Sequence, residues 1–395
     1  MTHEELKALD SQYIIHTYGR NDVDIDHGKN ATLYDQAGKE YIDFCAGIGV
    51  NSVGTANDQW QAAIVEQVGK LGHISNLFYT QPCALLAEKL CRRSGMAGVF
   101  FGNSGAEGNE GLIKVARKYS YDKYGAGRST ILTLTNSFHG RTMATLTATG
   151  QDKLHGEYFA PLVQGFRYAE PTLESVQSAA GDDVCAVLVE LVQGEGGVNP
   201  LPKDFIQALN QLCHERDWLL LCDEVQCGLG RTGSLFTWQQ YGVKPAACSF
   251  AKGIAGGLPM GGFLVDAPYF DVLGAGSHGS TFGGNPVSAA AGCAVLDILT
   301  DAVLDEVHKK GAYIKNAVEE MRLPCLGEVK GLGLMLGIEV RGYRTNKELC
   351  ALLVENGLLS LTAGPGLRFL PPLTITYEEI DKGLSILKST LQNIQ

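Results

Sequence analysis

Short, continuous apolar runs recur through the middle of the chain, with polar segments between them. The runs cover Ile131–Thr135, Val184–Glu190, Trp218–Asp223, Ala247–Ala251 and Gly262–Val265. Because apolar and polar residues do not alternate within them, we predict strands that are covered on both faces. An amphipathic pattern over residues 201–217 predicts a helix between two of these strands. Strands and helices in alternation are typical of an α/β protein with a mostly parallel, doubly wound sheet.

The pattern changes to mainly helical spacing after about Pro286. The later predicted elements are helices over residues 287–321, a strand over 331–340, a helix over 346–357 and a final helix from about Tyr377. Near the start, residues 31–44 predict a hairpin. We therefore predict a large domain over residues 46–290 and a small C-terminal α/β domain over residues 291–395. An N-terminal segment, residues 1–45, is expected to pack with the small domain.

Composition narrows the class of protein. With 395 residues, 45% of them hydrophobic and 19% charged, the chain is expected to be globular, with two or three domains. A net charge of −11 without a lysine or arginine run disfavours nucleic acid as a partner, although small anions stay possible. Eleven cysteines without a Cys-x-x-Cys pair predict reduced thiols and no metal site. The polar start and the lack of a long apolar stretch predict a soluble, cytoplasmic protein without a membrane partner.

A single lysine, Lys252, lies between an apolar run and a glycine-rich stretch in "SFAKGIAGGLPMGG", residues 249–262. A solvated loop charge is the ordinary interpretation of such a residue. However, a partly desolvated lysine has a lowered pKa and can act as a nucleophile toward a carbonyl group. Lys252 is therefore a candidate nucleophile.

Other polar residues follow apolar runs, and ligands in such folds bind at the carboxyl ends of the strands. Asp223 ends one run; a desolvated carboxylate there needs a cationic partner, unless it only caps the next turn. In "NSGAEGNE", Ser104 and Glu107 predict a capping box at a helix start. The first amides of that helix, at Gly105 and Ala106, could bind a phosphate, although most capping boxes bind no ligand.

The segment "NSFHGRTMAT" follows another predicted strand. It offers an aromatic ring in Phe138 and, in Arg141, a guanidinium suited to bidentate carboxylate binding. His139 could act as a base, or it could be a structural histidine.

The glycines of "GLGRTG", residues 228–233, match the spacing of a dinucleotide-binding loop. The acidic residue expected about twenty positions later is missing, because residues 242–262 contain no Asp or Glu. We therefore regard a nicotinamide-dependent dehydrogenase as a weak alternative.

The remaining candidates together meet the needs of one cofactor, pyridoxal 5′-phosphate. Its aldehyde needs a lysine, its phosphate a helix start, its ring a stacking partner and its pyridine nitrogen a carboxylate that keeps it protonated. A reactive lysine, a buried aspartate, a phosphate site and an aromatic ring are all predicted above.

Six motifs occur in the order and spacing of a known family. They are "FGNSGAEGNE", "FHGRT", "QGEGGV", "LLLCDEVQCGLGRTG", "AKGIAGGLPMGG" and "GSTFGGNP". On these motifs the chain resembles the class III (ornithine aminotransferase-like) family of pyridoxal-phosphate enzymes, over nearly its whole length. The resemblance implies the fold type I architecture, a large domain with a doubly wound sheet plus a smaller α/β domain.

The resemblance also implies a set of cofactor-binding residues. They are Gly105, Ala106, Phe138, Asp223, Gln226, Lys252 and Thr281. By similarity, Lys252 binds the cofactor aldehyde, Asp223 pairs with the pyridine nitrogen, and both are the expected catalytic residues. Gln226 would contact the phenolic oxygen of the ring. Thr281 would reach the phosphate in the neighbouring subunit, which implies a homodimer with shared active sites.

The residues implied for the substrate are Arg141, Ser280, Tyr18, Glu195 and Arg368. Arg141 resembles the arginine that binds the α-carboxylate of the substrate. Arg368 resembles a second carboxylate-binding arginine, which Glu195 pairs with while an ω-amine enters. A purely structural salt bridge between Glu195 and Arg368 is the alternative.

The activity that the resemblance implies is transfer of the δ-amino group of N2-acetylornithine to 2-oxoglutarate, in arginine biosynthesis. Alternatives within the family are transaminases of succinylornithine, ornithine or 4-aminobutyrate, and an aminomutase is a further one. Ile48 stands where ornithine-specific enzymes have a tyrosine, which favours an acylated donor. Two departures from the family are "GTAND" at residues 54–58, in place of a Gly-His-x-His-Pro run, and Gly108 in place of alanine.

Overall fold

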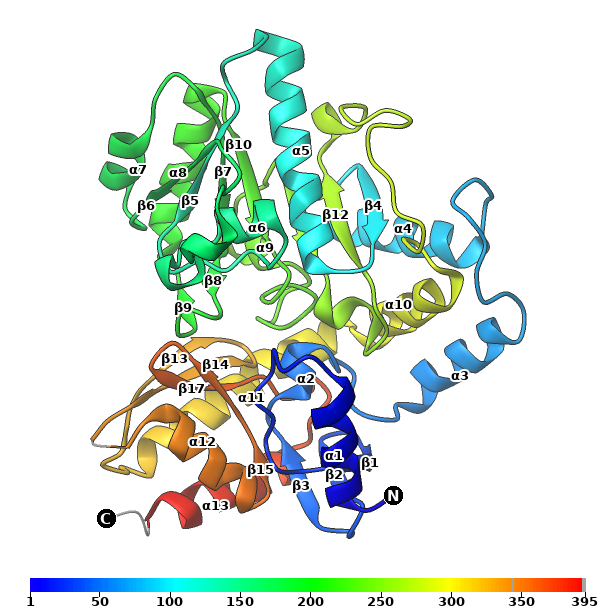
Figure 1. Ribbon diagram of the computed structural model, residues 1–395, viewed down its shortest axis with the longest axis vertical. Coiled ribbons are helices and arrows are strands. Elements are labelled where there is room, and N and C mark those ends of the chain that lie inside the picture. The colour runs from blue at the N-terminus through cyan, green and yellow to red at the C-terminus, as the bar shows by residue number, and fades with distance from the viewer. Residues whose placement is uncertain (343, 393–395) are drawn as a thin grey trace.

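A seven-stranded sheet forms the middle layer of the larger part of the protein in the computed structural model, which describes residues 1–342 and 344–392 (Figure 1). Its strand order is β4-β12-β11-β10-β7-β5-β6. The strands are β4 (Gly98–Gly102), β5 (Thr130–Leu134), β6 (Phe166–Ala169), β7 (Val184–Val189), β10 (Leu219–Asp223), β11 (Ala247–Phe250) and β12 (Gly261–Val265). In this sheet β12 runs antiparallel to both of its neighbours, β11 and β4. The remaining neighbouring strands of the sheet pair in parallel. The predicted α/β fold with a mostly parallel sheet is therefore confirmed.

The strands are continuously apolar because side chains on both faces are buried. In β7, Val187 and Val189 belong to the core that includes α8 (Lys203–Arg216). Leu188 of the same strand points into a second core, which includes α5 (Gly105–Tyr124). Helices thus cover the two faces of the sheet (Figure 1). This arrangement leaves the carboxyl ends of the strands as the edge at which polar residues can gather.

A second, four-stranded antiparallel sheet lies in the C-terminal part, in the order β13-β14-β17-β16. The elements of this part are α10 (Pro286–Ile298), α11 (Asp301–Glu320), β13 (Leu326–Leu332), β14 (Met335–Val340), α12 (Asn346–Glu355), β15 (Leu358–Leu359), β16 (Leu361–Ala363), β17 (Gly366–Phe369) and α13 (Tyr377–Gln392). The single strand predicted over residues 331–340 is wrong in one respect. The chain turns back at Gly333, whose φ of 53° suits glycine, so the run belongs to two paired strands.

The N-terminal segment pairs with the C-terminal part rather than with the large sheet. It contains α1 (His3–Tyr13), β1 (Ile25–Lys29), β2 (Thr32–Asp35) and β3 (Glu40–Asp43). The predicted hairpin is confirmed by the antiparallel pairing of β2 with β3. Strand β3 also pairs in parallel with β15, and Glu379 of α13 accepts a hydrogen bond from the Ala31 N–H at 3.0 Å. In Figure 1 these elements lie together below the large sheet. The exact domain boundaries near residues 45 and 290 stay a prediction.

The remaining short elements connect these layers. They are α2 (Ala46–Gly49), α3 (Asp58–Val68), α4 (Gln81–Ser94), α6 (Met143–Ala148), η1 (Asp152–Leu154), η2 (Glu157–Phe159), α7 (Leu173–Ala179), β8 (Val192–Gln193), β9 (Asn199–Pro200), α9 (Thr237–Tyr241), η3 (Lys252–Ala255) and η4 (Ala267–Tyr269). Within residues 1–342 and 344–392, no single helix is long and apolar enough to cross a membrane. The helix pair α10 and α11 meets that test of length and composition only jointly, with a bend of 72° between them.

Close packing between α5 and the sheet depends on Gly108. A Cβ atom at this position would lie 2.4 Å from the carbonyl oxygen of Gly262 in β12. Alanine would improve the helix propensity of α5 by up to about 1 kcal/mol. The backbone contact cannot be relieved by a side-chain rotation, however, so the helix or the strand would have to move. Overpacking of this kind typically costs about 1–3 kcal/mol.

We therefore expect Gly108→Ala to lower the free energy of unfolding by about 1–2 kcal/mol, measured by chemical denaturation. Gly274→Ala is the matched control, because a Cβ there would meet no described atom within 4 Å, and its effect should stay within about 0.5 kcal/mol. A Gly108→Ala protein as stable as the parent would show that α5 can shift without cost.

Candidate functional site

A cavity of about 440 Å³ lies at the carboxyl ends of the central strands. The predicted site residues that line it are Gly105, Ala106, Phe138, Arg141, Asp223, Gln226 and Lys252. They come from segments that follow four strands, β4, β5, β10 and β11, so the sheet topology assembles residues that are far apart in the sequence. This is the position at which doubly wound sheets bind their ligands.

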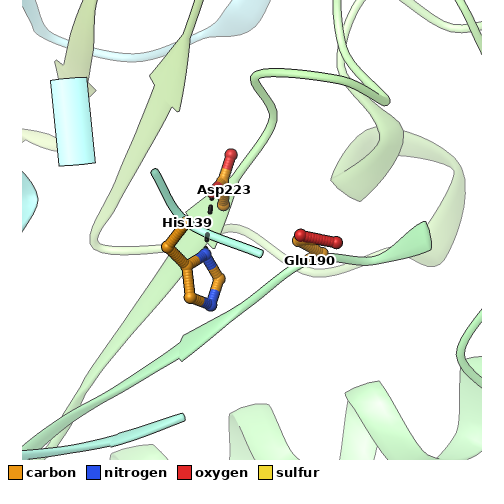
Figure 2. Close-up of side chains that lie close together, drawn as sticks. All are labelled: His139, Glu190 and Asp223. Atoms are coloured by element: carbon orange, nitrogen blue, oxygen red, sulfur yellow. Dashed lines mark hydrogen bonds and ion pairs between the residues drawn. The ribbon is translucent and has the colours of Figure 1, made fainter. Parts of the chain in front are cut away.

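Asp223, the last residue of β10, is the most completely hydrogen-bonded group in the cavity wall. Its Oδ2 accepts hydrogen bonds from Asn109 Nδ2 at 2.7 Å and is 2.8 Å from His139 Nδ1 (Figure 2). Its Oδ1 accepts a hydrogen bond from the Val225 N–H at 3.0 Å. The side chains of Asp223 and His139 are 3% and 0% exposed. These contacts orient a buried carboxylate. Its charge is screened less than in water, so it attracts a cationic group in the cavity more strongly.

His139, Glu190 and Asp223 lie close enough together to suggest a metal site, since their ligand atoms are all within 4.8 Å of one another (Figure 2). The hydrogen bonds argue for a different role. Asp223 Oδ2 is already occupied by Asn109 and His139, and both carboxylate oxygens of Glu190 accept backbone N–H groups. The cluster is therefore built as a hydrogen-bonded network, and the expectation of no metal site stays a prediction.

Glu190 is a residue that the sequence analysis counted only as the end of a strand. Its Oε1 accepts the Phe138 N–H at 2.9 Å, and its Oε2 accepts the Gly194 N–H at 3.1 Å. Burial, with a further contribution from the Asp223 charge, raises the pKa of Glu190 well above its ordinary value. The carboxyl group thus ties the loop with the aromatic ring to the loop that leads to Glu195. A buried acid directly after an apolar run was the signal that could have identified it.

Lys252 begins η3, directly after β11, and its side chain lines the cavity. Its φ of 41° lies in the left-handed region, which is costly for a residue with a Cβ and is found at functional sites more often than elsewhere. Burial lowers the pKa of Lys252, while the charges of Asp223 and Glu195 oppose that change. The net lowering favours the neutral, nucleophilic form of the amine. The structure therefore places Lys252 where a reactive lysine was predicted.

The start of α5 forms one end of the cavity. The Ser104 hydroxyl caps this helix by accepting the Glu107 N–H, as predicted. The second half of the predicted capping box is wrong, because the Glu107 carboxylate accepts the N–H of Asn103 at 2.9 Å instead of that of Ser104. The amides of Gly105 and Ala106 have no acceptor within the helix. A 20-residue helix directs its positive end at this point, which suits a phosphate group.

Phe138 and Arg141 lie next to each other in the lining of the cavity. The Arg141 Cζ lies 5.4 Å from the centroid of the Phe138 ring, close enough for a cation–π contact. Arg141 is exposed at the cavity mouth, so its guanidinium can receive a carboxylate from outside. The ring and the guanidinium therefore offer a stacking surface and an anion-binding group side by side.

Glu195 and Arg368 form an ion pair beside the cavity, as predicted. The Nη1 of Arg368, in β17, lies 2.5 Å from Oε1 of Glu195. Arg368 is 4% exposed at its side chain and Glu195 32%. Burial acts to raise the pKa of Glu195, but the charge and hydrogen bonds of Arg368 hold it below its ordinary value. The pair joins a strand of the C-terminal sheet to the loop after β8.

Five predicted residues are not among those that line this cavity. They are Glu195 and Arg368, which form the pair beside it, and Ser280, Thr281 and Tyr18. The Ser280 hydroxyl accepts a hydrogen bond from Asn103 Nδ2 at 3.0 Å and so borders it. Thr281 is exposed and lines a separate hollow of about 800 Å³ together with Phe78 and Tyr79. Tyr18 is 75% exposed. Within the described part of one chain, the structure does not bring Thr281 and Tyr18 to Lys252.

The family departures and the rejected dinucleotide loop can also be located. None of residues 54–58 is among the described residues that line the cavity. The loop after β10 that carries Gly228, Gly230 and Gly233 leads to α9, a helix of only five residues. A dinucleotide-binding loop opens a long helix whose start receives the pyrophosphate, and α9 is too short for this role. The structure therefore also disfavours a nicotinamide-dependent dehydrogenase.

The cavity fits pyridoxal 5′-phosphate by the chemistry of its donor set. It combines a buried amine, a hydrogen-bonded buried carboxylate, an aromatic ring and the open amides of a long helix within one volume. Each of these groups matches one part of the cofactor.

Comparison of the chain with known proteins also indicates an aminotransferase. A model of the class III aminotransferase family matches residues 14–391. The chain is 47% identical to the acetylornithine aminotransferase of Haemophilus ducreyi, over 100% of both chains. It is 45% identical to the acetylornithine aminotransferase of Wolinella succinogenes, over 98% of this chain and 100% of that one. A structure of the ornithine aminotransferase from Toxoplasma gondii, with partial occupancy of PLP at its active site, superposes with a TM-score of 0.93 at 30% identity. That match covers 99% of this chain and 94% of the other.

The chain belongs to the class III aminotransferases. The predicted family, fold class, aminotransferase activity and pyridoxal-phosphate cofactor are thereby confirmed. The roles of the individual site residues remain predictions. The distances and contacts described above allow each of them to be tested by substitution.

The first such prediction concerns the charge of Asp223. Asp223→Asn should slow amino transfer by about a hundredfold, the equivalent of two pKa units at the ring nitrogen, while part of the cofactor stays bound. Turnover and cofactor absorbance measure the two effects separately. Ser249→Ala is the control, because it removes only a 3.4 Å contact to Asp223 Oδ1 and keeps the charge. An unchanged turnover number with weaker cofactor binding would make Asp223 an anchor only.

Proposed function

We propose that the protein transfers the δ-amino group of N2-acetylornithine to 2-oxoglutarate, yielding N-acetylglutamate 5-semialdehyde and glutamate, as a step of arginine biosynthesis. The relatives with 47% and 45% identity over nearly full length are named acetylornithine aminotransferases, which supports this donor. The observation in the structure that supports it best is the Glu195–Arg368 pair beside the cavity with Lys252. Such a pair can serve two substrates of different charge in one site.

The chain supplies the groups that hold and tune the cofactor. Bound pyridoxal 5′-phosphate supplies an electron sink that stabilises a carbanion at the carbon carrying the amino group. The Gly105 and Ala106 amides would bind its phosphate, and the Phe138 ring would stack on its plane. The Asp223 carboxylate would keep its ring nitrogen protonated, and Gln226, which lines the same cavity, would contact its phenolic oxygen. Lys252 would hold its aldehyde and then, as a neutral amine, move a proton at the Nζ atom.

Two arginines would recognise the substrates. Arg141, exposed at the cavity mouth, would bind the α-carboxylate of the donor. Arg368 would be masked by Glu195 while an ω-amine enters, because an unmasked guanidinium repels the cationic amine. When 2-oxoglutarate enters, Glu195 would move away and Arg368 would bind the second carboxylate. The ion pair would therefore admit first an amine and then a dicarboxylate.

Ile48 bears on the choice of donor. Ile48 is 43% exposed, has a left-handed φ of 65°, and stands where ornithine-specific relatives are expected to have a tyrosine. An apolar residue there favours an acylated donor. Succinylornithine, ornithine and 4-aminobutyrate remain the alternative donors, and an aminomutase would make no use of the second carboxylate site at Arg368.

A homodimer with shared active sites belongs to the same proposal. Thr281 lies away from Lys252 in one chain, in a hollow bordered by Leu77 and by Tyr79. Leu77 is 86% exposed and Phe78 61% exposed, which is unusual for large apolar side chains. A second copy that covers this surface would bring Thr281 to the partner's cofactor phosphate. A cytoplasmic location and the absence of nucleic-acid or membrane partners stay predictions.

A panel of donors tests the proposed function. With 2-oxoglutarate as the acceptor, acetylornithine should give the highest kcat/KM among acetylornithine, succinylornithine, ornithine and 4-aminobutyrate, measured by glutamate formation. A higher value for ornithine or 4-aminobutyrate would contradict the proposed donor but keep the reaction class.

The reaction class is tested by Lys252→Ala. This variant should lose at least 10²–10⁴-fold in turnover, because removal of a general base alone typically costs that much. The yellow colour of a lysine-bound cofactor should be lost as well. Activity within about threefold of the parent would contradict the assignment of Lys252.

A further inference from the structure

Gln226 connects the two members of the Glu195–Arg368 pair. Its Oε1 accepts a hydrogen bond from Arg368 Nη1 at 2.9 Å, and its Nε2 donates to Glu195 Oε1 at 3.3 Å. The same Nη1 also contacts Glu195 Oε1. The three side chains therefore form a closed triangle in which the amide uses its acceptor toward the arginine and its donor toward the glutamate.

The backbone leaves room for this amide at one particular point. A Cβ atom on Gly194 would lie 2.2 Å from Oε1, 2.4 Å from Cδ and 2.6 Å from Nε2 of Gln226. The amide thus packs directly against the α-carbon of Gly194, and no larger residue fits there without displacing it. Gly194 itself is fixed, because its N–H donates to Glu190 Oε2. The Gln226 amide therefore occupies space that glycine at position 194 leaves open.

Only one member of the ion pair can readily move. The backbone carbonyl of Glu195 accepts the Gly364 N–H at 3.0 Å, so the loop with Glu195 is tied to the turn between β16 and β17. The Arg368 side chain is 4% exposed and enclosed, whereas that of Glu195 is 32% exposed. Opening of the pair must therefore come from rotation of the Glu195 side chain into open space. In that movement the hydrogen bond from Gln226 to Glu195 breaks, while the one from Arg368 to Gln226 can persist.

We propose that Gln226 is a specificity-determining positioning residue that holds Glu195 on Arg368 and so favours the masked state of the site. The inference rests on the proposed function, in which the masked state receives the ω-amine and the open state receives a dicarboxylate. It adds a role to the contact with the cofactor ring expected for this residue. Loss of the amide should shift the pair toward the open state, because the hydrogen bond to Glu195 exists only in the masked one.

The test is the affinity of the holoenzyme for glutarate, a dicarboxylate without an amino group, measured by isothermal titration. Gln226→Met removes both hydrogen bonds at nearly constant volume, and it should bind glutarate about three- to tenfold more tightly. Gly194→Ala should act in the same direction, because its Cβ displaces the amide without removing it. If Gln226→Met does not fold, Gln226→Asn, whose shorter chain cannot reach both partners, replaces it with the same expected result.

Gln193→Met is the matched control. Gln193 is a buried glutamine in β8 whose Nε2 donates to the Thr135 carbonyl oxygen at 2.8 Å and whose amide is outside the triangle of Gln226, Glu195 and Arg368. Its substitution should leave glutarate affinity unchanged. Equal or weaker glutarate binding in Gln226→Met, or the same change in Gln193→Met, would overturn the proposal.

A kinetic split separates this role from a cofactor contact alone. In half-reactions, Gln226→Met should lower kcat/KM for acetylornithine more than for glutamate, by about three- to tenfold. A residue that only contacts the cofactor would lower both equally, and that result would overturn the proposal. If the parent enzyme does not use acetylornithine at all, the proposed donor fails, but the glutarate titration still decides the role of Gln226.

Discussion

Charged groups that are withdrawn from water must be paired, and this constraint shapes the whole cavity at the carboxyl edge of the large sheet. A buried charge without partners would cost several kcal/mol or would be neutralised. Asp223 is therefore surrounded by donors from Asn109, His139 and the backbone. Arg368 is paired with Glu195. Lys252 has no such fixed ion pair in the described chain, and its pKa is lowered by burial, which leaves its amine available for chemistry.

The pairing also makes the site depend on two parts of the protein. Asp223 and Lys252 come from the large sheet, whereas Arg368 comes from β17 of the C-terminal sheet. The Gly364 N–H to Glu195 carbonyl hydrogen bond fixes these two parts at the substrate end. In the proposed function, Arg368 at this boundary would receive one substrate carboxylate, while the residues expected to hold the cofactor lie on the large sheet and its loops. Rotation of the Glu195 side chain would then accommodate the change of substrate and would break its contacts with Arg368 and Gln226.

The fold class and the location of the site at the carboxyl ends of the strands could be predicted from the sequence. The strands are buried on both faces, which makes them continuously apolar, and polar residues follow them. That pattern puts Asp223, Lys252 and the start of α5 at the ends of strands, whereas their roles were inferred from the needs of one cofactor and from the family resemblance. The contacts that join distant segments could not be predicted in this way, since Glu190 and Gly194 act through hydrogen bonds and space that exist only in the fold. The bend at Gly333 was missed because apolar residues continue on both sides of it. The role expected for Thr281 follows from the family resemblance alone, because it would need a second copy of the chain, and it stays a prediction.

The masking of Arg368 by Glu195 is the central claim, and single-turnover half-reactions of Glu195→Gln test it most directly. Acetylornithine and glutamate are mixed separately with the parent and the variant, and the cofactor absorbance is followed. Without the carboxylate charge, Arg368 stays unmasked and repels the ω-amine of acetylornithine. The variant should lose about ten- to a hundredfold in kcat/KM for acetylornithine, equivalent to about 1.4–2.7 kcal/mol, and should keep or improve its reaction with glutamate. An equal fall in both half-reactions would show that the ion pair is only structural and would contradict the account.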